Sequence, residues 1–210
     1  HNAPWSIERL EQTFGRKFYF IPVAADSKHY FPDKPDQKFQ KCDIAFVGSA
    51  FTQKKDRFEE WFFPLAKKYT ICLYGPGWSL QDKVAAFSQK LARRFHLPRL
   101  AQFINSKRLT ITQDDERRLY ASAKICVNLH ESYKDKSTRG FTNDREFKVP
   151  ASGGFQISDY LPHLKMFFEP DEEIVLAKTP QEWFTKIDYY IKNEKERREI
   201  QKAGTERALR

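Results

Sequence analysis

The chain has 210 residues, of which 40% are apolar and 15% aromatic, so it can bury a core and is not intrinsically disordered. No run of 18 or more apolar residues occurs and the N-terminus lacks a signal-peptide pattern, so we expect a soluble, cytoplasmic domain. The net charge of +9 favours an anionic partner, and a small anion, a polyanion and an anionic membrane surface fit it equally well.

Cysteine and histidine do not indicate a metal site. The three cysteines are widely spaced and lie in or beside apolar runs, which is typical of buried free thiols in a reducing compartment. The five histidines show no paired ligand spacing. We therefore expect no metal and no bound cofactor.

Helical and strand-like segments alternate along the chain. Residues 1–40 are predicted to form a lead-in helix, an extended segment and a proline-containing linker. Short apolar runs predict strands at 43–48, 69–75, 109–112, 124–129, 154–158 and 173–177. Helical spacing predicts helices at 56–68, 81–95, 114–121 and 180–192, a short helix after residue 143, a helix or loop at 97–107, and a charged C-terminal helix at 194–210.

This alternation predicts an α/β fold for residues 41–193, a Rossmann-like parallel sheet with helices on both faces. Ligands of such sheets bind at the carboxyl ends of the strands. The polar or glycine residues that follow the strands are therefore site candidates: Gly48, Ser49, Gly75, Asn128, His130 and Asp159. For His130 a structural role is as plausible as ligand binding, and for Asp159 we favour capping of the next turn.

The segment 140–159 holds a candidate anion site. Asn143 or Asp144 can cap a short helix, on which Arg145 and Lys148 are three residues apart and share one face. Two cations near the positive end of a helix favour an anion between them, and phosphate fits best. The alternative is a solvated basic turn in front of a core strand.

Several motifs follow one another in a recognisable order: Asp43-Ile-Ala-Phe-Val-Gly-Ser49, Leu73-Tyr-Gly-Pro-Gly-Trp78, Tyr120-Ala-Ser-Ala-Lys-Ile-Cys-Val-Asn-Leu-His130 and Asn143-Asp-Arg-Glu-Phe-Lys-Val-Pro-Ala-Ser-Gly-Gly154. In this order they resemble the carboxyl-terminal half of GT-B glycosyltransferases, in particular the CgeB-like group related to family-4 enzymes. The resemblance covers residues 17–208 and implies a domain that binds a nucleotide sugar such as a UDP or GDP sugar. It also implies an amino-terminal half as partner and a glycan, protein or lipid-linked acceptor.

The resemblance implies a role for individual residues. Gly48 and Ser49 match the turn against the diphosphate, and Lys54, Lys55 or Arg57 match a cation beyond it. The remaining positions match the loop near the nucleotide, the strand end that faces the donor, and the phosphate-facing helix: Tyr74, Gly75, Asn128, His130, Asn143, Arg145 and Lys148. No catalytic base is implied, because the acceptor side of such enzymes lies mostly in the amino-terminal half.

One position departs from the family pattern. Lys148 stands where the family usually has a glutamate that holds the donor ribose, and the paired position eight residues earlier is Gly140. A lysine cannot accept a ribose proton as a carboxylate does. Ribose recognition has changed, donor binding is weaker, or the register is shifted by two residues to Glu146.

Two other functions are compatible with the sequence. A basic module that binds nucleic acid or another polyanion fits the charge, but no nucleic-acid-binding motif is present, so nucleic acid is not favoured. A catalytically inactive interaction domain fits the missing glutamates.

Overall fold

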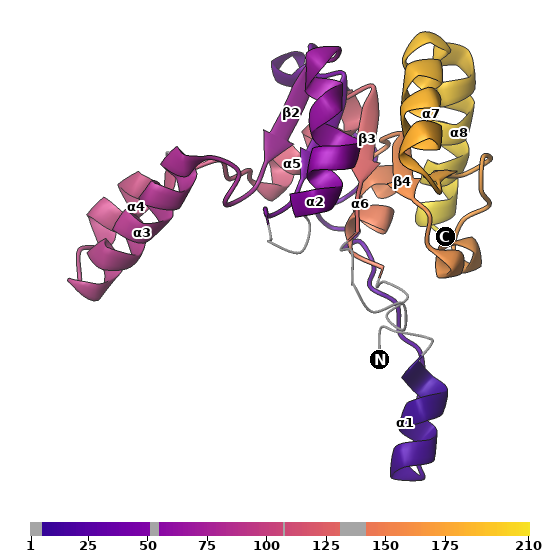
Figure 1. Ribbon diagram of the computed structural model, residues 1–210, viewed down its shortest axis with the longest axis horizontal. Coiled ribbons are helices and arrows are strands. Elements are labelled where there is room, and N and C mark those ends of the chain that lie inside the picture. The colour runs from indigo at the N-terminus through magenta and orange to yellow at the C-terminus, as the bar shows by residue number, and fades with distance from the viewer. Residues whose placement is uncertain (1–5, 51–54, 107, 131–141) are drawn as a thin grey trace.

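A five-stranded parallel sheet with the order β2-β1-β3-β4-β5 forms the centre of the protein. The structure is a computed structural model that describes residues 6–50, 55–106, 108–130 and 142–210 (Figure 1). The strands are β1 (Ile44–Val47), β2 (Ile71–Tyr74), β3 (Ile125–Asn128), β4 (Gln156–Asp159) and β5 (Val175–Ala177). Strand β2 lies on one side of β1, and the next strand, β3, lies on the other side, so the strand order reverses at β1. Open α/β sheets bind their ligands at such a reversal.

Helices cover both faces of the sheet, as predicted (Figure 1). Ile44 and Phe46 point to one face and belong to a core cluster that also contains Trp183 of α7. Ala45 points to the other face and belongs to a cluster that contains Tyr120 of α5. The first face is covered by α2 (Lys55–Arg57), the π-helical turn η4 (Phe58–Phe62), the 3-10 turn η5 (Phe63–Lys67) and α7 (Pro180–Lys192). The second face is covered by α5 (Gln113–Ser122), α6 (Arg145–Ala151) and the turn η2 (Gln37–Phe39).

Four further helices lie at the periphery. Helix α8 (Glu194–Ala208) packs against α6 and α7. In Figure 1, α1 (Ile7–Phe14) and the hairpin of α3 (Leu80–Arg94) and α4 (Pro98–Ser106) project from the body of the protein. The segment 97–107, predicted as helix or loop, is thus helical over α4. The turn η6 (Pro162–Met166) follows β4.

The predicted strand at 109–112 does not form. The carboxylate of Asp82 accepts a hydrogen bond from the Leu109 backbone at 3.4 Å, and Leu109 O accepts one from the Gly75 backbone at 2.6 Å. Because a side chain from α3 takes the backbone donor of Leu109, this segment joins β2 through a single bond and not through a ladder.

The predicted helix at 56–68 is also interrupted. Pro64 has no backbone N–H and its ring conflicts with the preceding turn, so the regular helix gives way to the π turn η4 and the 3-10 turn η5. The buried aromatic side chains of the predicted core face are retained, including Phe58, Trp61 and Phe62.

The proline-containing linker packs on the domain. Tyr30 and Phe39 are 2% and 3% exposed and join the core cluster beneath α5. Among the described residues, no helix is long and apolar enough to cross a membrane.

Candidate functional site

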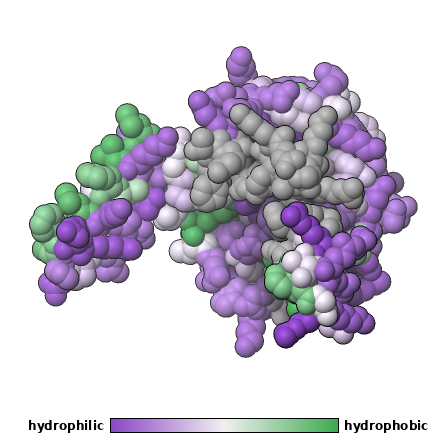
Figure 2. All heavy atoms as spheres, turned by 60° about the horizontal axis from the view of Figure 1, so that its bottom comes forward, coloured by the Kyte–Doolittle hydropathy of each residue, from purple (hydrophilic) through white to green (hydrophobic). Residues whose placement is uncertain are grey.

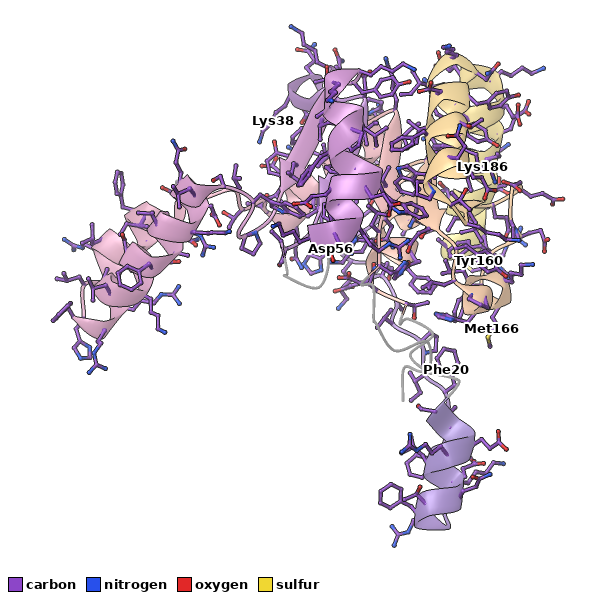
Figure 3. The ribbon with its side chains drawn as sticks, viewed as in Figure 1. Phe20, Lys38, Asp56, Tyr160, Met166 and Lys186 are labelled. Atoms are coloured by element: carbon purple, nitrogen blue, oxygen red, sulfur yellow. The ribbon has the colours of Figure 1, made fainter. Side chains whose placement is uncertain are left out.

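A pocket of about 310 Å³ lies at the carboxyl edge of the sheet, a volume at the lower end of the range for small-molecule sites. Figure 3 marks this edge, because Asp56 at the start of α2 and Tyr160 just after β4 both lie on it. The pocket is lined by Val47, Gly48, Gly75, Pro76, Thr110, Ile111, Glu116, Asp144, Arg145 and Lys148.

Two glycines form one wall of the pocket. A Cβ atom on Gly75, whose φ is +127°, would lie 2.1 Å from Gly48 O. A Cβ on Gly48 would lie 2.8 Å from Nη1 of Arg145 and 2.9 Å from the Phe46 ring. A side chain at position 75 would clash with the backbone of Gly48, and a side chain at position 48 would displace Arg145 or the Phe46 ring. Glycine at both positions therefore lets the two turns pack closely against each other beside Arg145.

Arg145 is held by neutral acceptors. Its Nε donates to Oδ1 of Asn128 at 2.8 Å and its Nη1 donates to Val47 O at 3.0 Å, while the guanidinium lies 5.0 Å from the centre of the Phe46 ring. Arg145 is only 9% exposed. Among the residues that the structure describes, no carboxylate forms an ion pair with it. Its positive charge is therefore available to an anion in the pocket.

The start of α6 is fixed by a reciprocal pair of hydrogen bonds. Asn143 Oδ1 accepts from the Arg145 backbone at 3.0 Å, and Glu146 Oε2 accepts from the Asn143 backbone at 2.8 Å. Of the two predicted caps, Asn143 is therefore the one whose side chain caps the helix. Its amide also exchanges hydrogen bonds with Asn128 at 3.1 and 3.2 Å, which joins α6 to the end of β3.

A buried charge network lies behind Arg145. His130 Nδ1 is 2.6 Å from Oδ1 of Asp159 and its Nε2 is 2.5 Å from Oε1 of Glu146. Arg57 Nη1 lies 2.8 Å from Oδ2 of Asp159. Asp159 therefore binds His130 and Arg57, and the turn cap that we favoured for it does not form.

The network keeps His130 charged at neutral pH. Burial alone would lower the pKa of His130, but the charges of Glu146 and Asp159 outweigh it and raise this pKa from 6.5 to about 9. Burial opposes the charge of Asp159 as well, yet His130 and Arg57 hold the pKa of that carboxyl below its ordinary value. Arg57, His130 and Arg145 together face the two carboxylates of Glu146 and Asp159, so this group of five side chains carries one net positive charge.

Lys148 faces the pocket and Glu146 does not. Lys148 Nζ is 2.6 Å from Oδ2 of Asp144 and 3.9 Å from Oε2 of Glu116, and it lies 4.8 Å from the centre of the Tyr30 ring. Burial lowers the pKa of Lys148, but the hydrogen bond to Asp144 and the charge of Glu116 raise it above its ordinary value. Glu146 is fully buried in the network, so the two-residue shift in register that would bring it to the pocket is not supported.

The predicted site residues separate into groups. Gly48, Gly75, Arg145 and Lys148 meet in the pocket. Four others support it from the buried network or the helix start: Arg57, Asn128, His130 and Asn143. Ser49 is not among the lining residues, and the Tyr74 ring packs edge-on against Phe39. Lys54 lies outside the described residues.

Two acidic residues of the pocket were not predicted from the sequence. Glu116 accepts hydrogen bonds from the hydroxyls of Tyr30 and Tyr120, each at 2.7 Å, and Asp144 pairs with Lys148. Both residues lie near the start of a helix, where acidic side chains are common because they stabilise the helix. An acidic residue at such a position therefore does not indicate a binding site in the sequence. Among the residues that the structure describes, no group of three or more His, Cys, Asp or Glu side chains is arranged to hold a metal ion.

Known structures share this fold. Sucrose-phosphate synthase from Thermosynechococcus elongatus is 14% identical with a TM-score of 0.60, over 99% of this chain and 52% of that one. HepE from Anabaena in complex with UDP-glucose is 13% identical with a TM-score of 0.60, over 99% of this chain and 57% of that one. The C-terminal domain of a group 1 glycosyl transferase from Francisella tularensis is 17% identical with a TM-score of 0.55, over 89% and 97% of the two chains.

The fold is that of one half of a GT-B glycosyltransferase, because the chain spans about half the length of the two longer proteins. A family model described as glycosyl transferase-like matches residues 53–210, and the chain belongs to this family. No curated protein matches the sequence. The CgeB-like subgroup stays a prediction.

Proposed function

We propose that this chain is the donor-binding half of a glycosyltransferase and that its pocket holds the diphosphate of a nucleotide sugar. The observation that carries the proposal is the Arg145 guanidinium, which neutral acceptors fix in the pocket beside Gly48 and Gly75. Family membership supports it, and HepE, a protein with the same fold, has been crystallised with UDP-glucose.

In this proposal Arg145 stabilises the leaving group. Cleavage of the bond between sugar and diphosphate develops negative charge on the diphosphate, and a fixed cation in a water-poor site lowers the free energy of that charge. The buried network of Glu146, His130 and Asp159 holds Asn128 and thereby the guanidinium. These residues are therefore positioning residues, and Arg145 is the one that contacts the donor.

Ribose recognition in this pocket differs from the family pattern. The ammonium of Lys148 donates hydrogen bonds to a phosphate or hydroxyl oxygen but accepts none. Acceptors are nevertheless at hand, because Glu116 and Asp144 line the same pocket. We assign to these two carboxylates the role that the family gives to its glutamate, with UDP or GDP as the nucleotide.

The reaction needs further components. No residue of the pocket is assigned as catalytic base, and the acceptor is expected to be a glycan, a protein or a lipid-linked molecule that meets the donor across a cleft to an amino-terminal half. Our proposal for this chain is limited to donor binding and leaving-group stabilisation, and it includes no metal or other cofactor.

Calorimetric titration with UDP, GDP and their sugar conjugates tests the proposal. We expect micromolar binding of one nucleotide, weakened at least about tenfold by Arg145→Met, which removes the charge and keeps much of the side-chain volume. Arg94→Ala, an exposed cation on α3, is the matched control and leaves binding unchanged. Thermal unfolding of both variants separates lost binding from lost folding.

Two outcomes overturn the proposal. Salt-sensitive binding of RNA or DNA without nucleotide binding identifies the basic polyanion-binding module. If the folded protein binds neither a nucleotide nor a nucleic acid, the result favours the catalytically inactive interaction domain.

A further inference from the structure

The projecting α3–α4 hairpin carries an apolar stripe on its outer side. Because successive residues of a helix turn by about 100°, the α3 side chains of Leu80, Val84, Phe87 and Leu91, with Phe95 just after the helix, fall within an arc of roughly 80°. These side chains are 77%, 56%, 69%, 45% and 65% exposed. Figure 2 shows apolar side chains gathered on one side of this hairpin and hydrophilic ones on the other.

The stripe faces away from the contact between the two helices. The buried residues of α3 are Asp82, Gln89 and Ala92, which lie on the opposite side of the helix. In α4, Ala101 is buried while Leu100 is 47% exposed. The hairpin therefore packs through small and polar side chains, and burial in its own fold does not account for its largest apolar ones.

A buried ion pair holds the root of the hairpin in place. Arg108 Nε lies 3.1 Å from Oδ1 of Asp82, and its Nη1 donates to Oε1 of Gln89 at 3.2 Å. Asp82 Oδ2 also accepts from the Gly77 backbone at 2.6 Å. The stripe is thus presented by an anchored element and not by a free end of the chain.

The exposed charges of the hairpin are all positive. Asp82 is the one acidic residue of the segment 80–106, and it is 3% exposed and paired with Arg108. The exposed ionised side chains are Lys83, Lys90, Arg93, Arg94 and Arg99. On the helical projection Lys83, Lys90 and Arg94 border the apolar stripe along one side.

We propose that the α3–α4 hairpin docks this protein onto an anionic lipid bilayer, with α3 lying in the plane of the interface. An apolar stripe bordered by Lys and Arg is the pattern by which helices insert into the boundary between headgroups and acyl chains. The long cationic side chains reach the anionic headgroups while their stems and the stripe contact the acyl region.

Charge decides against a second copy of this chain as the occupant. Two stripes that face one another bring two identical sets of cations together with no exposed acid on either hairpin to pair with them. An anionic bilayer is complementary in both charge and polarity. The proposal does not depend on nucleotide binding, so either can fail alone.

Vesicle co-sedimentation tests the docking. The whole chain is incubated with vesicles of phosphatidylcholine alone and with vesicles of phosphatidylcholine and phosphatidylglycerol in a ratio of about 3:1, a surface of negative potential. We expect binding to the anionic vesicles at least about tenfold stronger than to the neutral ones and weakened by salt. Equal binding to both kinds of vesicle, or to neither, overturns the proposal.

Matched variants locate the contact. Phe87→Ser with Leu91→Ser shortens the stripe at exposed positions and is expected to weaken binding roughly tenfold or more, without loss of folding. Met166→Ser with Tyr189→Ser replaces side chains that are 57% and 46% exposed elsewhere and leaves binding unchanged. Sedimentation velocity tests the alternative that the stripe is an interface between copies of this chain. That alternative holds if the protein binds neither kind of vesicle and forms a dimer that Phe87→Ser with Leu91→Ser abolishes.

Discussion

A Cβ atom on Gly48 would lie 2.8 Å from Nη1 of Arg145, so the glycine at the end of β1 provides the space in which the guanidinium sits. Gly48→Ala forces Arg145 or the Phe46 ring to move. We expect at least about tenfold weaker nucleotide binding by calorimetry and a loss of about 1–3 kcal/mol in the free energy of unfolding in urea.

The control for this change is Gly15→Ala. Gly15 ends α1 with φ +60° and has no atom within 4 Å of its Cβ position, so alanine there costs backbone strain but touches nothing near the pocket. Unchanged nucleotide binding in Gly48→Ala would show that Arg145 does not need its present position.

The second prediction concerns the buried carboxylate of Glu146. Glu146→Ala leaves His130 with one carboxylate and removes acceptors from the Asn143 backbone and the Asn128 amide. We expect the free energy of unfolding to fall by about 3–5 kcal/mol, as for other buried ion pairs that lose one partner. Glu59→Ala, which removes the exposed partner of Lys55, is the control and changes it by less than about 0.5 kcal/mol. Similar decreases in the free energy of unfolding for Glu146→Ala and Glu59→Ala would show that the buried network does not stabilise the fold.

A third prediction is the pH dependence of stability. The pKa of His130 is raised to about 9 in the folded protein and lies near 6.5 in the unfolded chain. A raised pKa means that the stabilising contribution is complete below about pH 6.5 and is lost as the pH rises through about 9.

Urea unfolding between pH 6 and 10 measures this loss. We expect the free energy of unfolding of the wild type to decline across the window more steeply than that of His130→Gln, which cannot be protonated. His96→Gln replaces an exposed histidine and is the control, with the slope of the wild type. Equal slopes in all three proteins would show that His130 is neutral in the folded state.

The strands and the glycines after them could be predicted because apolar runs, glycine and helical spacing are local signals. The pairing of Lys148 with Glu116 could not, since those residues are 32 positions apart in the sequence and meet only through the packing of α5 and α6. For the same reason the sequence could not show that Arg145 and Lys148, the two cations expected to hold an anion, differ in their partners. Arg145 has neutral partners, while Lys148 already has two carboxylates beside it.

The failed strand at 109–112 has a comparable cause. Its apolar residues alternate with threonines, which is a good local strand pattern, but strand formation also requires free backbone donors along the edge of β2. Asp82, 27 residues earlier, takes the donor of Leu109 and the side chain of Arg108. Tertiary contacts of a side chain therefore overrode a correct local signal.

The last prediction places at position 148 the glutamate that the family resemblance implies there. In Lys148→Glu a third carboxylate enters a pocket that already holds Glu116 and Asp144, and the cation that pairs with both is lost. We expect the free energy of unfolding at pH 7 to fall by about 1–3 kcal/mol and to recover partly toward pH 5, where carboxylates begin to share protons. Lys148→Met removes the cation without adding an anion, so its loss should be smaller and less dependent on pH.

Nucleotide binding by the same two variants decides how the ribose is held. If Glu116 and Asp144 accept the ribose hydroxyls, Lys148→Glu repels the diphosphate and weakens calorimetric binding more than Lys148→Met does. Tighter binding by Lys148→Glu would instead show that the ribose needs a carboxylate at position 148. In that case the lysine lowers the affinity of this pocket for its donor, and our assignment of Glu116 and Asp144 is wrong.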